Sequence, residues 1–135
     1  MLFRSTFVVA DIPGLIEGAH EGAGLGIRFL KHVERTKVLV HLVDVSEHTG
    51  RKPAEDFKII LKELASFSAE LAAKPMIVVA SKIDVAQDAR RISSLKQTAR
   101  RRKLPFHEIS SVTGKGLPEL IHAMEEYVFK PPAAD

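Results

Sequence analysis

The chain has 135 residues, of which 45% are apolar and 27% are charged, and its formal net charge is +3. This length predicts one domain with a sizeable buried core, and the balanced composition excludes a disordered protein. No apolar run approaches the roughly 20 residues that a membrane-spanning helix needs, so we expect no membrane span. The absence of cysteine excludes disulfides and thiolate metal sites and fits a cytoplasmic protein.

Short apolar runs alternate with amphipathic stretches along the chain. The apolar runs are rich in β-branched residues and predict four buried strands, at residues 6–10, 37–43, 76–80 and 105–109. Apolar residues at helical spacing predict helices between and after the strands, at residues 26–35, 53–74, 86–102 and 118–130. This alternation predicts an α/β fold, with a parallel sheet and helices on both of its faces.

Polar loops follow three of the predicted strands. The first loop begins at Asp11, the second covers residues 81–84 and the third covers residues 110–114. Because the carboxyl ends of parallel strands meet at one edge of a sheet, we expect the three loops to form one ligand site.

The first loop belongs to a stretch with five glycines, D-I-P-G-L-I-E-G-A-H-E-G-A-G-L-G. This stretch resembles the switch-II segment of the Obg family of bacterial GTPases. The resemblance implies a P-loop NTPase-like fold, GTP or GDP as the ligand and Mg²⁺ as a cofactor. It places Asp11 near the metal, through a water molecule, and it adds Ile12, Pro13 and Gly14 to the GTP-binding residues.

The second loop, Ser81-Lys82-Ile83-Asp84, resembles the N-K-x-D box with which GTPases bind guanine. A carboxylate offers two acceptor oxygens and guanine presents two adjacent donors, so Asp84 can bind the base in a charge-assisted bidentate pair. Adenine lacks that donor pair and would leave Asp84 unpaired. The stem of Lys82 can lie along the base or the ribose. Ser81 replaces the asparagine of the family pattern.

The third loop begins Ser110-Ser111-Val112 and resembles the last GTPase box, often written S-A-x-T-G. In that box, backbone N–H groups meet the carbonyl oxygen of guanine, so small residues suffice. The same residues also suit a capped helix start.

Two motifs of a complete G domain do not occur in these 135 residues. The sequence contains no G-x-x-x-x-G-K-[ST] motif, which would bind the phosphates and Mg²⁺, and no switch-I threonine. The resemblance therefore implies a partial G domain over residues 1–135, incomplete at its N-terminal third and weakened in nucleotide binding. Leu15 cannot orient the attacking water as a glutamine does in many GTPases, so we expect slow hydrolysis and assign no catalytic residue.

The strand that leads into the P-loop lies, in GTPase folds, between the strands predicted here at residues 6–10 and 37–43. Without it, either those two strands pair directly or a gap stays between them, and a gap would expose unpaired N–H and C=O groups of apolar strands. We therefore expect self-association through this gap, with residues 6–10 as the least protected strand.

One other function stays open, and a second is disfavoured. The predicted helix at 86–102 is basic and could bind RNA phosphates. This suits the resemblance to a family linked to ribosome assembly, with a ribosomal subunit or rRNA as the partner. Alternatively, the chain binds no nucleotide and is an interaction module for RNA or protein.

A phosphoacceptor receiver domain is disfavoured, because Asp11 lacks the neighbouring acidic residue that such a domain needs. The six histidines show no metal-ligand spacing.

Overall fold

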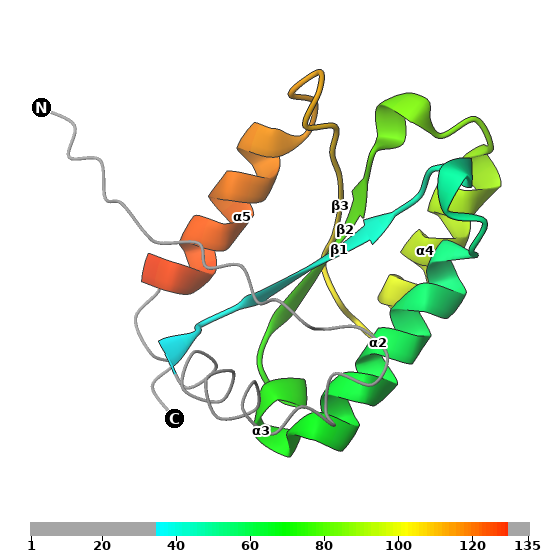
Figure 1. The fold of residues 1–135 in the computed structure, drawn as a ribbon. Helices are drawn as coiled ribbons and strands as arrows, with labels where there is room; N and C mark the ends of the chain where they lie inside the picture. Colours follow the sequence, from blue (N-terminus) through cyan, green and yellow to red (C-terminus); the bar gives the residue numbers. More distant parts are fainter. Residues whose placement is uncertain (1–34, 130–135) are drawn as a thin grey trace, which may run out of the picture.

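The computed structural model describes residues 35–129, which form a three-stranded parallel sheet covered by helices (Figure 1). The strand order is β1-β2-β3, with β1 paired to β2 and β2 paired to β3. The strands are β1 (Leu39–Asp44), β2 (Met76–Ser81) and β3 (Phe106–Glu108). The α-helices are α2 (Pro53–Phe67), α3 (Ala69–Ala72), α4 (Ala89–Arg101) and α5 (Leu117–Phe129), and the 3-10 helices are η2 (Glu47–Thr49) and η3 (Ile83–Val85). The predicted strand at 6–10, the predicted helix at 26–35 up to its last residue, and the predicted gap beside that strand lie outside the described residues.

Helices cover both faces of this sheet, as the sequence predicts. In Figure 1, α2 and α4 lie on one side of the strands and α5 lies on the other. The larger core cluster joins β1 and β2 to α2, α3 and α4 through side chains that include Val43, Phe57, Leu64 and Leu95. The smaller cluster joins β2 to α5 through Ile77, Val79, Ile109 and Leu120. Within residues 35–129, no helix is both long and apolar enough to cross a membrane.

The helix predicted over residues 53–74 is in fact two helices, so that prediction is wrong at Ser68. The backbone of Ser68 is extended, with φ −160° and ψ 120°. Its amide donates to the carbonyl of Leu64 in the last turn of α2, and its hydroxyl accepts from the amide of Leu71 in the first turn of α3, at 3.1 Å. Serine is a preferred N-cap because its oxygen satisfies a free amide of the first turn. The apolar period continues across the break, which hides it from a sequence pattern.

Strand β1 is less covered than its apolar sequence predicts. Leu39 and Val43 are buried, but Leu42 is 58% exposed. The prediction that both faces of this strand are covered is therefore wrong at Leu42, because α5 packs over β2 and not over this end of β1.

Candidate functional site

The carboxyl ends of the three described strands lie at one edge of the sheet, and two predicted site loops meet there. The loop after β2 contains Lys82 and Asp84, and the loop after β3 contains Ser110. The amide of Ile83 donates to the carbonyl of Ile109 at 3.3 Å, which joins the two loops through their backbones. The first predicted site loop, with Asp11, Ile12, Pro13 and Gly14, lies outside the described residues.

Ser110 is the side chain that connects the two loops. It is fully buried, and its hydroxyl donates to Oδ1 of Asp84 at 2.8 Å. The hydroxyl oxygen of Ser110 also accepts from the amide of Thr113 at 3.1 Å, so this side chain stabilises its own loop as well. An ionised carboxylate has about four acceptor positions. The bond from Ser110 therefore orients Asp84 and leaves most of its acceptor capacity free.

The amides of Ser111 and Val112 are donors without a partner in the described residues, in the loop whose Ser110 contacts Asp84. Within the described residues neither amide donates a hydrogen bond, while those of Ser110, Thr113 and Gly114 all do. Val112 is 83% exposed, at the tip of this loop. The site thus combines a carboxylate acceptor with exposed backbone donors, which are the groups that a base with adjacent donors and a carbonyl oxygen requires.

Gly116 fixes the far end of the same loop. Its φ is +79°, and a Cβ at this position would overlap the carbonyl oxygen of Glu108 in β3. Only glycine allows this close approach at a left-handed backbone angle. The loop from Ser110 to Gly116 is therefore held against the end of β3 while α5 begins beyond it.

Lys82 has an uncommon backbone conformation for a residue with a side chain. Its φ is +61° and its ψ is +38°, in the left-handed region. Such conformations are sparsely populated and persist where surrounding contacts hold them, often at functional sites. Here the preceding Ser81 hydroxyl donates to the carbonyl of Val43 at 3.2 Å, tying the end of β2 to the end of β1. The contact that the sequence leaves open for Ser81 is thus a bond within the sheet.

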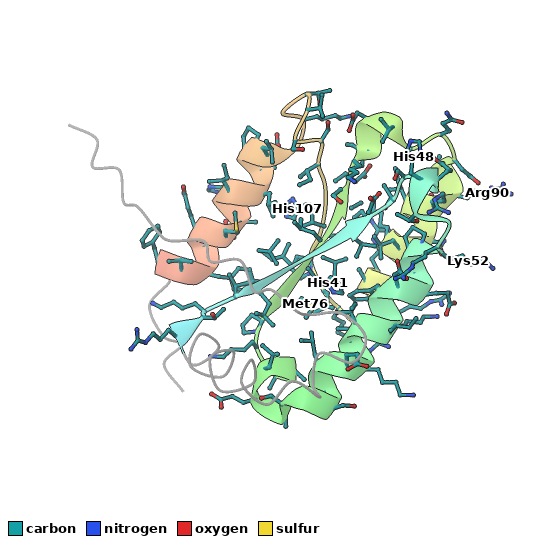
Figure 2. All side chains as sticks on the ribbon, viewed as in Figure 1. His41, His48, Lys52, Met76, Arg90 and His107 are labelled. Atoms are coloured by element: carbon teal, nitrogen blue, oxygen red, sulfur yellow. The ribbon has the colours of Figure 1, made fainter. Side chains whose placement is uncertain are left out.

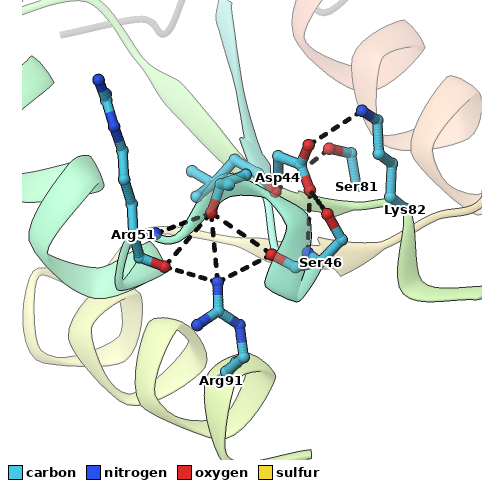
Figure 3. A network of polar contacts seen from close by, with 8 residues as sticks. Asp44, Ser46, Arg51, Ser81, Lys82 and Arg91 are labelled. Atoms are coloured by element: carbon cyan, nitrogen blue, oxygen red, sulfur yellow. Dashed lines mark hydrogen bonds and ion pairs between the residues drawn. The ribbon is translucent and has the colours of Figure 1, made fainter. Parts of the chain in front are cut away.

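Asp44 lies at the same edge of the sheet and contacts the loop after β2, although the sequence pattern does not place it in the predicted nucleotide site. Its Oδ2 accepts from Nζ of Lys82 at 3.0 Å, and its Oδ1 accepts from the amide and hydroxyl of Ser46 at 2.9 Å and 2.7 Å (Figure 3). Burial raises the pKa of this carboxyl, but the bonds from Ser46 and Lys82 outweigh burial and hold the pKa below its ordinary value. Its position at the end of an apolar strand, level with Ser81 in β2, is the signal that could have identified it.

The side chain of Arg91 binds the protein's own backbone, so it does not belong to the exposed basic surface of α4. Its Nε donates to the carbonyl of Val45 at 3.0 Å, and one of its Nη atoms donates to the carbonyls of Ser46 and Arg51 (Figure 3). In return, the carboxylate of Glu47 accepts from two amides just before α4. This reciprocal arrangement fixes the loop after β1 against α4.

The histidine and acidic side chains form no metal centre in the part of the chain that the structure describes. No three histidine, aspartate or glutamate side chains there are placed to hold an ion. His41, His48 and His107 lie apart from one another (Figure 2). Asp11, the residue predicted near Mg²⁺, is outside this part.

A parallel α/β sheet whose strand ends carry an S-K-x-D loop bonded to a serine-rich loop is the arrangement expected of a GTPase domain. A model of the 50S ribosome-binding GTPase family matches residues 2–82. The chain is 64% identical over 129 residues to the GTPase Obg of Solibacter usitatus and 62% identical to that of Acidobacterium capsulatum. It is 50% identical to the GTPase Obg of Thermodesulfovibrio yellowstonii. The chain belongs to the Obg family of GTPases, as the sequence predicts.

The matched region covers nearly all of this chain but a much smaller share of each relative. They include 96%, 95% and 93% of this chain but 38%, 37% and 37% of the three relatives. The chain therefore spans less than two fifths of the length of the curated relatives it matches.

Proposed function

We propose that this chain is the guanine-reading part of an Obg-type G domain. The loop from Ser81 to Asp84 and the residues Ser110, Ser111 and Val112 bind the base. The observation that carries the proposal is the 2.8 Å hydrogen bond from Ser110 to Asp84. It joins, through side chains, the two loops that the family resemblance assigns to one base.

The donor and acceptor pattern supports guanine. The Asp84 carboxylate can accept from N1–H and the exocyclic amine of guanine, which a single carboxylate matches as a bidentate pair. The unpaired amides of Ser111 and Val112 can donate to the adjacent carbonyl oxygen. Adenine presents neither the donor pair nor that oxygen, so a site of this kind discriminates strongly against it.

Phosphate binding and hydrolysis need groups beyond those in the described part. The 135 residues contain no P-loop motif, and a P-loop supplies the amides, the lysine and the hydroxyl that hold the phosphates and Mg²⁺. We propose that Asp11 approaches Mg²⁺ through water, and that Gly14 and its neighbours approach the γ-phosphate. GTP hydrolysis, slow because Leu15 replaces glutamine, then belongs to a complete G domain, and this chain alone binds GTP with a Kd of roughly millimolar or weaker.

The proposed partner is the ribosomal subunit, through RNA. Within residues 35–129, the cations at the end of α4 are exposed and form none of the ion pairs found there; they are Arg100, Arg101, Arg102 and Lys103. This exposed cluster is also the observation that favours the second candidate, an RNA-binding module that needs no nucleotide, since phosphate contacts dominate RNA affinity.

The test is a titration of the ¹⁵N-labelled chain with GDP, ADP and xanthosine diphosphate, followed by amide chemical shifts. We expect GDP, and not ADP, to shift the amides of residues 82–84 and 110–112. Asp84→Asn should weaken GDP and favour the xanthine nucleotide, because asparagine donates where guanine also donates and xanthine has a carbonyl. Asp56→Asn is the matched control, since Asp56 pairs with Arg51, 3.7 Å away, outside both loops.

Unchanged guanine preference in Asp84→Asn would show that Asp84 does not read the base. A calorimetric Kd of about 1 µM for GTP would contradict the weak binding expected without a P-loop. RNA-induced shifts confined to residues 100–103, with no response to GDP, would favour the second candidate.

A further inference from the structure

We propose that Asp44 is a positioning residue for Lys82, and through Lys82 for the bound base; this inference rests on the proposed function. Lys82 is the residue whose stem would cover the base or ribose, and its position is set by what holds its two ends. At the backbone end, it has the left-handed conformation described above. At the other end, its ammonium group lies 3.0 Å from Oδ2 of Asp44.

Asp44 is itself held rigidly, which a positioning residue must be. Oδ1 accepts two bonds from Ser46, one from the amide and one from the hydroxyl. Ser46 has no exposed surface. The two carboxylate oxygens therefore have separate partners: one is anchored in the protein and the other faces Lys82 (Figure 3).

The anchor continues into α4. The carbonyl of Ser46 accepts from Arg91 at 2.9 Å, and the neighbouring carbonyls of Val45 and Arg51 accept from the same guanidinium. Ser46 is thus held from both sides, by Asp44 and by Arg91. The resulting series of contacts runs from α4 through the loop after β1 to the lysine of the guanine loop.

A free lysine side chain loses much rotamer freedom when it is fixed against a ligand. An ion pair that already restricts the stem lowers that loss at the time of binding, which is the effect of pre-organisation. The Lys82 side chain is 62% exposed, whereas that of Asp44 is 29% exposed. For an ion pair of this exposure, we expect a contribution to base affinity of about two- to fivefold.

The experiment compares GDP binding by the ¹⁵N-labelled chain in four variants with that of the unmodified chain. Asp44→Asn should raise the Kd for GDP about two- to fivefold, while Asp56→Asn, which removes an ion-pair carboxylate of similar exposure (27% against 29%), should leave it unchanged. Lys82→Met keeps the apolar stem and removes the charge. In the double variant, Asp44→Asn with Lys82→Met, the Kd for GDP should equal that of Lys82→Met alone. Such non-additivity is expected of residues that act through one another.

Each outcome has a distinct meaning. Unchanged amide shifts of Val78 and Val79 establish that Asp44→Asn is folded, since both are buried in β2. An effect of Asp44→Asn that persists undiminished in the Lys82→Met background would show a general structural role and overturn the inference, as would an effect no larger than that of Asp56→Asn. Absence of any GDP response in the unmodified chain, up to about 10 mM, would instead overturn the proposed function.

Discussion

Strands β1 and β2 are neighbours with similar apolar sequences, L-V-H-L-V-D and M-I-V-V-A-S, yet they differ in burial. Met76 to Ala80 are all buried in β2, whereas only Leu39 and Val43 are buried in β1. Strand β2 has a strand on each side and helices over both faces. Within residues 35–129, β1 has a strand on one side only. The comparison shows that an apolar run predicts a strand, but the position of that strand in the sheet decides how much of the run is covered.

Backbone exchange gives the largest expected difference between the two strands. The amides of Leu39 and Val45 donate to carbonyls at the two ends of β2. By the two-residue period of a strand, the amide of Leu42 points away from β2. Opening free energies in a domain range from near zero at its margins to the full free energy of unfolding in central strands. We therefore expect the Leu42 amide to exchange with solvent orders of magnitude faster than that of Val79, measured by hydrogen exchange and NMR.

Equal protection at Leu42 and Val79 would break this comparison. It would mean that a strand from outside residues 35–129, or a second copy of the chain, pairs with β1. Dilution separates the two: protection by a second copy falls with concentration, and light scattering reports the same association. Substitution of Leu42 by lysine should then reduce the association, because charge on an edge strand opposes strand addition.

Truncation of matched side chains gives the second largest difference. Ile77 in β2 and Leu42 in β1 lie on the α5 face of the sheet, but Ile77 has no exposed surface and Leu42 is 58% exposed. Ile77→Ala should lower the free energy of unfolding by about 2 to 5 kcal/mol, because it leaves a cavity. Leu42→Ala should change it by less than about 0.5 kcal/mol. Urea denaturation measures both changes in the free energy of unfolding, provided that the variants have the same m-value as the unmodified chain. A comparable loss for Leu42→Ala would show that this face of β1 is covered.

The third difference between the two strands is a titratable side chain. Strand β1 has His41 at the position level with Val78 of β2, so its contribution to stability depends on pH. Burial lowers the pKa of His41 to about 4 from an ordinary value of 6.5. Its ring packs against Phe57 with centroids 5.1 Å apart, and its Nδ1 is buried without a hydrogen-bond partner in the described part of the chain. The unfolded chain therefore binds a proton more readily than the folded chain between these two pH values.

Stability should accordingly be lost as the pH falls from about 6.5 to about 4, and His41 should account for about 2 to 3 kcal/mol of that loss. His41→Leu, with no proton to bind, should remove this part of the pH dependence in denaturation curves recorded across the range. The exposed His48, exchanged for glutamine, is the control. A pH profile of His41→Leu that matches the unmodified chain would show that folding does not lower the pKa of His41.

Strand and helix positions were largely predictable because local patterns set them. The strands predicted at 37–43, 76–80 and 105–109 differ from β1, β2 and β3 by at most two residues at either end. The break at Ser68 was missed because the apolar period runs through it, and only the extended backbone of Ser68 and its bond to the Leu71 amide reveal that the chain has left the helix. The exposure of Leu42 was missed because a sequence pattern contains no information on which strand is central.

By itself, the sequence determined the alternation of strands and helices and the family, and it predicted the loops that we propose to bind the base. Tertiary structure alone decided which side chains in those loops meet. Asp44 and Lys82 are 38 positions apart and Asp84 and Ser110 are 26 apart, so neither contact follows from local spacing. Both depend on the register in which β1, β2 and β3 pair, because that register sets which strand ends lie level with one another. The same register places Arg91, which the sequence presents as one more basic residue of a helix, against the carbonyls that hold Ser46.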